Sequence, residues 1–142
     1  MINVAVISDI HGNASALNMC LESISNRNVD ILICLGDILT YGTQPNQVID
    51  RLDKYQRNGK LIMIKGNHEE FYFSSDILAS YKIPSFVKES IDWTKEKLKF
   101  TKLEKIFDWR THYSFKNIFF AHANPFQYGD WSYIETETKI AE

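Results

Sequence analysis

Short apolar runs alternate with polar turns in the first half of the chain. The runs Val4–Ile7, Val29–Leu35 and Leu61–Ile64 are rich in β-branched residues, which is typical of strands buried on both faces. Each run ends at a polar turn, and apolar residues at helical spacing follow the first two turns. This order predicts βαβ units with right-handed crossovers, and therefore a parallel sheet in an α/β fold.

Polar side chains follow each of these predicted strands at its carboxyl end. Asp9 and His11 come after the first strand, Asp37 after the second, and Asn67 with His68 after the third. In open α/β sheets, ligands bind at the edge formed by the carboxyl ends of the strands. We therefore expect these five side chains to converge there, although they are far apart in the sequence.

The second half of the chain has a different pattern. Residues 69–110 are predicted to be helical, and Thr101–Glu104 has the pattern of a capping box that opens another helix. The periodicity then changes to two strands around a tight turn, which predicts a hairpin. The hairpin strands are His112–Phe115 and Ile118–Ala121. Residues 133–142 are predicted to begin a further helix.

Length and charge limit the kind of protein. With 142 residues, the chain is expected to form one domain over residues 1–142. Its 16 basic and 18 acidic residues give a net charge of −2, which provides no basic excess for a nucleic-acid polymer or an anionic membrane. Its apolar runs are too short to span a bilayer. Cys20 and Cys34 lie in apolar sequence, which predicts buried, reduced thiols in a cytoplasmic protein.

The first two polar turns offer carboxylates and an imidazole. In an extended backbone, residues i and i+2 point to the same side, so Asp9 and His11 would face one small volume and suit a divalent first-row metal. Gly36 permits a sharp turn that aims Asp37 inward, where its two oxygens could bridge two metal ions. Each motif alone also fits a simpler role, with Asp9 capping a helix, His11 exposed in a loop, and Gly36-Asp37 forming a common turn.

The third polar turn and the end of the hairpin add the remaining candidates. Asn67 offers a neutral amide oxygen as a ligand, and His68 stands at a helix start, where it could act as a general acid or base. His122 follows the last apolar run. The alternative is that Asn67 caps the helix, His68 lies on its first turn, and His122 is an ordinary strand-end residue.

In this order the motifs resemble the signature of the calcineurin-like metallophosphoesterase superfamily. The opening also resembles the bacterial branch that holds the symmetrical diadenosine tetraphosphatases and the protein serine/threonine phosphatases. The stretch after the second motif is similar to small, single-domain bacterial members. The residues that carry the resemblance are Ser8–Asn13 with Asp9-x-His11, Gly36-Asp37, Tyr41–Asp50, Gly66-Asn67-His68-Glu69 and His122.

The resemblance implies an αββα sandwich with two divalent metal ions, for which manganese, iron, zinc and nickel are candidates. Asp9 and His11 would bind one ion, and Asp37 would bridge it to the second. Asn67 and His122 would bind the second ion. A hydroxide bridging the two ions would attack the phosphorus of a phosphomonoester or phosphodiester, with dinucleoside polyphosphates and phosphoproteins among the candidate substrates.

The resemblance also implies that His68 is the catalytic residue. It would protonate the leaving group and, with Asn67, bind the phosphate of a small substrate. No motif here predicts a nucleic-acid polymer or a membrane as a partner.

The superfamily pattern ends with Gly-His-x-His, and this sequence has no such motif. We therefore expect a sandwich that is incomplete at its C-terminal side, and a homo-oligomer that covers the exposed sheet. A catalytically inactive remnant that acts as a binding or assembly module is the alternative function. A flavodoxin-like module would explain the βαβ pattern, but the chain lacks a glycine-rich phosphate loop.

Overall fold

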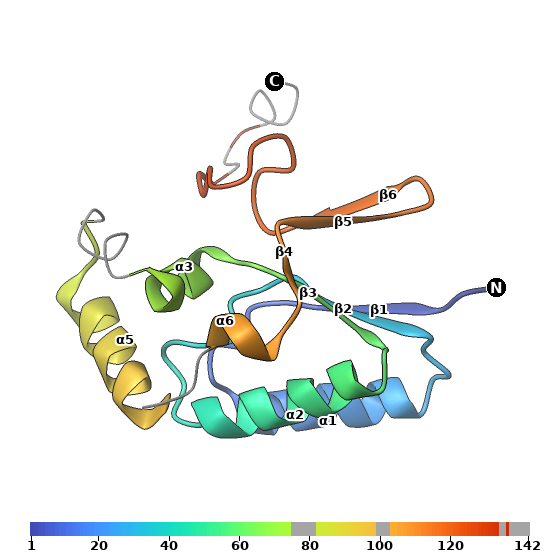
Figure 1. Cartoon of the computed structure of the whole chain (residues 1–142), viewed down its shortest axis with the longest axis horizontal. Helices are drawn as coiled ribbons and strands as arrows, with labels where there is room; N and C mark the ends of the chain where they lie inside the picture. Colours follow the sequence, from blue (N-terminus) through green and yellow to red (C-terminus); the bar gives the residue numbers. More distant parts are fainter. Residues whose placement is uncertain (75–81, 99–102, 134–135, 137–142) are drawn as a thin grey trace.

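The computed structural model of the chain describes residues 1–74, 82–98, 103–133 and 136. Its larger sheet has four parallel strands in the order β1-β2-β3-β4, so β1 lies at one edge (Figure 1). The strands are β1 (Val4–Ile7), β2 (Ile31–Cys34), β3 (Leu61–Ile64) and β4 (Trp109–Arg110). Ile7 pairs with Cys34, and Cys34 with Met63, so the carboxyl ends of the first three strands lie level.

Two helices lie side by side against one face of this sheet (Figure 1). They are α1 (Ala14–Ser25) and α2 (Pro45–Arg57). The side-chain oxygen of Asn13 accepts the N–H of Ala16 at 2.9 Å and so caps α1, whereas Pro45 fixes the first turn of α2. The chain continues through α3 (Asn67–Phe73), α5 (Ser85–Leu98) and α6 (Leu103–Ile106).

The main core lies between the sheet and these two helices. Alternate strand residues contribute one half of it and the inner faces of the helices the other half. Prominent members are Leu32, Cys34, Leu61 and Met63 from the sheet, and Leu17, Leu21, Val48 and Leu52 from the helices. Burying each aliphatic side chain contributes roughly 1.5–3 kcal/mol. This layer holds the strand ends, and with them the loops that follow, in fixed positions.

The opposite side of the sheet carries an antiparallel hairpin (Figure 1). Its strands are β5 (His112–Phe115) and β6 (Ile118–Ala121), and β5 contacts β3. This side of the sheet is less covered than the side with the two helices. Val6 on β1 is 47% exposed, and Ile118 on the hairpin is 52% exposed. The two faces of the sheet therefore differ in how completely they are buried.

The predicted α/β fold with a parallel sheet and a C-terminal hairpin is confirmed. The second strand begins at Ile31 rather than Val29. The prediction that helix extends to residue 110 is wrong, because Trp109–Arg110 forms β4 and pairs with Met63 and Ile64. A strand of two residues is too short to show an alternating pattern, and only the neighbouring strand reveals it.

Two predictions fall partly or wholly outside the described residues. The expected capping box is partly outside them, because Thr101 and Lys102 are not described. The helix expected after it is present as α6, which begins at Leu103. The helix expected within residues 133–142 lies outside the described residues, apart from 133 and 136.

The prediction that both cysteines are buried holds for one of them. Cys34 is fully buried in β2, as expected, but Cys20 is exposed on α1, so the prediction that both thiols are buried is wrong. Cys20 is one position away from the buried Leu21 on a helix, and a shift of that size moves a side chain off the apolar face. Within the described ranges, no helix combines the length and the apolar character needed to cross a bilayer.

Candidate metal centre at the carboxyl edge of the sheet

Main-chain hydrogen bonds join the loops that follow β1 and β2. The N–H of Asp9 donates to the carbonyl of Gly36 at 3.1 Å, and the N–H of His11 donates to the carbonyl of Asp37 at 2.9 Å. The N–H of Gly12 continues this ladder to the carbonyl of Ile38 at 2.8 Å. The two loops therefore extend the strand pairing beyond the sheet and hold Asp9, His11 and Asp37 in register.

The loops after β2 and β3 cross so closely that both need glycine. A Cβ on Gly36 would lie 2.3 Å from the nitrogen of Gly66, and Gly36 has a φ of +108°. A Cβ on Gly66 would lie 2.2 Å from Oδ1 of Asp37. These distances are far below van der Waals contact, so the crossing places Asp37 directly beside the start of α3.

Three of the candidate ligand residues have left-handed backbones. Asp9, His11 and Asp37 have φ values of 54°, 47° and 53°. Non-glycine residues in this region are strained by roughly 1–3 kcal/mol each, and such strain concentrates at functional sites. The expectation of an extended backbone at Asp9 and His11 is therefore wrong. The two side chains nevertheless face each other, as expected.

A cavity of about 610 Å³ lies above these loops. Every candidate site residue from the sequence lines it, together with aromatic residues from two loops. The lining consists of Ser8, Asp9, His11, Leu35, Asp37, Tyr41, Asn67, His68, Ala121, His122, Ala123, Trp131, Ser132 and Tyr133. The structure thus brings all six predicted residues together, and it adds Tyr41 and Trp131, which were not predicted as site residues.

The ring of His11 is oriented by a main-chain carbonyl. Its Nδ1 lies 3.0 Å from the carbonyl oxygen of Leu39, which can only accept, so Nδ1 carries the proton. In the neutral ring Nε2 then presents a lone pair. Nε2 lies 3.7 Å from Oδ1 of Asp9 and 4.0 Å from Oδ2 of Asp37. The nitrogen lone pair and the carboxylates therefore face a common point.

His122 repeats this arrangement from the other side. Its Nδ1 lies 2.9 Å from the carbonyl oxygen of Leu35, which orients Nε2 toward the cavity. Nε2 lies 3.2 Å from Oδ1 of Asn67 and 3.6 Å from Oδ2 of Asp37. A ring that donates from one nitrogen to a carbonyl and presents the other is typical of a histidine that binds a metal ion.

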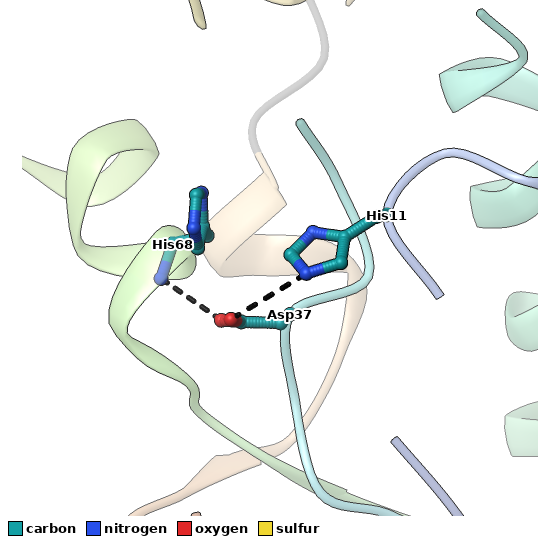
Figure 2. A group of neighbouring side chains, drawn as sticks. All are labelled: His11, Asp37 and His68. Atoms are coloured by element: carbon teal, nitrogen blue, oxygen red, sulfur yellow. Dashed lines mark hydrogen bonds and ion pairs between the residues drawn. The ribbon is translucent and has the colours of Figure 1, made fainter. Parts of the chain in front are cut away.

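The two oxygens of Asp37 have different partners. Oδ1 accepts the main-chain N–H of His68 at 2.9 Å, and Oδ2 faces the Nε2 atoms of both His11 and His122. Figure 2 shows Asp37 between His11 and the start of α3. Burial raises the pKa of this carboxyl, and its hydrogen bond from His68 and the nearby His11 offset that rise only in part. A bound cation would favour the ionised form.

His68 is buried against the cavity floor. Its side chain is among aromatic rings, with centroids 5.0 Å from His11, 5.2 Å from Tyr41 and 5.6 Å from Phe71. Among the described residues, Nδ1 of His68 is buried and has no hydrogen-bond partner. Burial, followed by the proximity of His11 and His122, lowers the pKa of His68 to about 4. In the metal-free protein the ring is neutral near pH 7.

Two overlapping groups of donor atoms could each hold a metal ion, and both include Asp37. Ligand atoms of His11, Asp37 and His68 lie within 4.8 Å of one another, as do those of Asp9, Asp37 and His122. Within each group, lone pairs of nitrogen and oxygen atoms face each other. A cation between them would bind these lone pairs, which have no hydrogen to share among themselves. Mixed nitrogen and oxygen donors suit manganese, iron, zinc or nickel.

Comparison with known proteins agrees with this geometry. The calcineurin-like phosphoesterase family matches residues 2–142. The uncharacterized protein MJ0912 of Methanocaldococcus jannaschii is 34% identical over 137 residues, which cover 92% of this chain and 53% of that protein. The chain belongs to the calcineurin-like phosphoesterase family.

Solved structures show the same fold at lower identity. The hypothetical protein PH1004 of Pyrococcus horikoshii OT3 has a TM-score of 0.70 at 24% identity, covering 80% of this chain and 50% of its own. The metallophosphoesterase from Sphaerobacter thermophilus has a TM-score of 0.57 at 23% identity, with coverage of 80% and 43%. The present chain thus spans about half the length of the relatives that it matches.

Proposed function

We propose that the protein is a metal-dependent phosphoesterase with two divalent cations at the carboxyl edge of the sheet. The observation that carries this proposal is the shared position of Asp37. Its Oδ2 faces the Nε2 atoms of His11 and His122, and both rings are held by main-chain carbonyls. Such an arrangement presents donors to two cations at once. Family membership supports the same reaction class.

Each residue of the site has a distinct proposed task. Asp9 and His11 hold one cation, Asn67 and His122 hold the other, and Asp37 serves both. The cations would neutralise the phosphate charge and supply hydroxide as the nucleophile.

His68 is the proposed catalytic residue, because it lines the cavity beside His11 and Asp37. It would hydrogen-bond a phosphate oxygen, with Asn67 beside it. The negative charge of the bound phosphate would raise the pKa of His68, so that the ring could take up a proton and give it to the departing oxygen.

We propose small phosphomonoesters or phosphodiesters as substrates, with dinucleoside polyphosphates and phosphoproteins as further candidates. The net charge of −2 makes a nucleic-acid polymer or a membrane surface an unsuitable partner. The cations must therefore provide the attraction for phosphate, because Lys and Arg are absent from the described cavity lining. The competing function is a catalytically inactive binding module on the same fold.

A manganese titration by calorimetry, paired with a hydrolysis assay on bis(4-nitrophenyl) phosphate, separates these functions. The enzyme should bind two manganese ions and release nitrophenol. The matched variant His68→Ala should still bind two ions but turn over roughly 10²–10⁴-fold more slowly, as expected when a general acid is removed. Binding without hydrolysis in the wild type would favour the inactive module. Absence of any manganese binding would refute the metal centre itself.

We also propose that a second copy of the chain covers the exposed side of the sheet. Val6 on β1 is 47% exposed, and Ile118 and Phe119 on the hairpin are 52% and 47% exposed. Strand β1 also presents an unpaired edge among the described residues. Apolar faces and open edges favour association. Sedimentation at micromolar concentration should show a dimer, and a monomer that binds no apolar dye would contradict this.

The cytoplasm is the proposed compartment. Cys20 and Cys34 are both free thiols, and a reducing environment keeps them so. Cell fractionation with an antibody against the chain tests this, and recovery with secreted proteins would contradict it.

A further inference from the structure

One carboxylate in the site touches neither the cavity nor any proposed metal position. Glu69, in the first turn of α3, has no exposed surface. Its Oε2 accepts the main-chain N–H of Asp37 at 2.8 Å and that of Gly66 at 2.7 Å. Its Oε1 accepts the N–H of Ile38 at 2.9 Å. A single side chain therefore holds three main-chain donors.

These donors belong to two different loops. Asp37 and Ile38 follow β2, whereas Gly66 follows β3, at the crossing where neither glycine tolerates a Cβ. The connection also runs in the opposite direction, because the N–H of His68 donates to Oδ1 of Asp37 at 2.9 Å. Glu69 and Asp37 thus tie each other's loops together, and this leaves only Oδ2 of Asp37 directed at the histidines.

Stability alone explains this arrangement poorly. Glu69 has no exposed surface, and a fully buried carboxylate loses its hydration, which costs free energy. The three N–H donors offset this in part. Two neighbouring carboxylates repel each other, and no Lys or Arg forms an ion pair with Glu69 within the part of the chain that the structure describes. These hydrogen bonds restrain the main chain of Asp37, and a metal centre needs that restraint.

We propose that Glu69 is a positioning residue that fixes the loops carrying Asp37 and Asn67 at the separation the cations require. This proposal rests on the proposed metal centre. Glu69 contacts the main chain of Asp37 and Gly66 and acts through these N–H groups on the side chains that would bind the cations. Partners of metal ligands typically change metal affinity 10–100-fold when they are altered.

The first test is Glu69→Gln in the full chain, with Mn²⁺ affinity measured by calorimetry. In glutamine, an amide NH₂ group replaces one of the two oxygens that accept main-chain N–H groups. An NH₂ group cannot accept such a bond, so one loop should lose its hydrogen bond to residue 69. We expect Mn²⁺ to bind roughly 10–100-fold more weakly. If the wild type fails to bind Mn²⁺, the proposed function fails. If the wild type binds and Glu69→Gln binds equally well, only the positioning role fails.

Two controls separate positioning from charge and from general instability. Glu70→Gln removes the neighbouring carboxylate on the same helix, which contacts Tyr128 and Lys65 rather than the two loops. Leu52→Ala weakens the core far from the loops by about 2–5 kcal/mol. Both variants should keep near wild-type Mn²⁺ affinity in the folded state. An equal loss of affinity in either control would overturn the specific role of Glu69.

A second measurement uses the wild type only, so it remains valid if Glu69→Gln does not fold. Hydrogen exchange in the wild type reports the opening of the amides of Asp37, Ile38 and Gly66. If the opened state cannot hold the cation, zinc at 100 times its Kd should slow their exchange by about 100-fold, by linkage. Unchanged exchange of these three amides in the presence of bound zinc would overturn the proposal.

Discussion

The two ends of the parallel sheet carry cavities of nearly equal size and opposite charge. The cavity at the carboxyl edge, about 610 Å³, holds Asp9 and Asp37. The cavity near the amino edge, about 580 Å³, is lined by Arg51, Lys54 and Lys60. Size and charge alone would rank them equally as binding sites.

Orientation distinguishes the two cavities. At the carboxyl edge, main-chain groups fix the rings of His11 and His122 and the carboxylate of Asp37. At the amino edge, Lys54 in the last turn of α2 and Lys60 just before β3 are exposed, whereas Arg51 donates to Asn18 and to the main-chain carbonyl of Gln47. Cations near the C-terminus of a helix complement its dipole, which explains them without a ligand. Charged groups thus indicate a site only where the fold holds them in place.

Replacing Asp37 should produce the largest change. Asp37→Ala should abolish cation binding at both positions, a loss of more than about 100-fold that exceeds the effect of altering an outer partner. Asn67→Ala should weaken one position only, because Asn67 approaches His122 and not His11. Calorimetric stoichiometry distinguishes them, and two bound ions in Asp37→Ala would contradict the shared role. Lys54→Ala at the amino edge is the matched control and should leave both ions bound.

A pair of glycines tests how tightly each edge is packed. Gly36→Ala should lower the free energy of unfolding by at least about 3 kcal/mol, because it combines a strained backbone with a Cβ that overlaps the next loop. Gly59→Ala, at the amino edge, also has a positive φ, of +70°, but its Cβ would meet nothing within 4 Å. We expect a change of only about 1–2 kcal/mol there. Urea unfolding measures both, and equal losses would refute the contrast.

The two cysteines offer a smaller test of burial below the carboxyl edge. Cys34 ends β2 directly before the loop of Asp37, and burial raises the pKa of its thiol to about 12. Cys34→Ser should destabilise the fold by about 1–3 kcal/mol, since it buries a hydroxyl without an assured partner. Cys20→Ser on the exposed side of α1 should change stability by less than about 0.5 kcal/mol. Thermal unfolding of the two variants should rank them in this order.

The smallest effect should come from the lysine side chains at the amino edge. Lys54→Ala removes an exposed charge in the last turn of α2, and we expect about 0.3–1 kcal/mol at low salt. The loss should shrink in high salt because screening weakens an exposed charge. A larger, salt-independent loss in urea unfolding would show that this edge is also a fixed structure, which would remove the contrast between the two edges.

Much of the site was predictable because strand ends meet at one edge of a parallel sheet. That rule anticipated the meeting of Asp9, His11, Asp37, Asn67 and His68 from the periodicity of the strands. The metal-binding roles of these residues remain predictions that the variants above address. The rule did not reveal Tyr41, whose ring lies against His11 and His68 and whose main chain is left-handed, with a φ of 67°.

The sequence by itself determined the α/β order, the parallel sheet and the residues able to bind a cation, because these follow from local periodicity and side-chain chemistry. Only the tertiary structure decided which atoms face one another. Strand β4, the crossing of Gly36 and Gly66, and the three donors to Glu69 all depend on contacts between distant segments. No local pattern encodes such contacts, since each exists only after the core has packed the segments together.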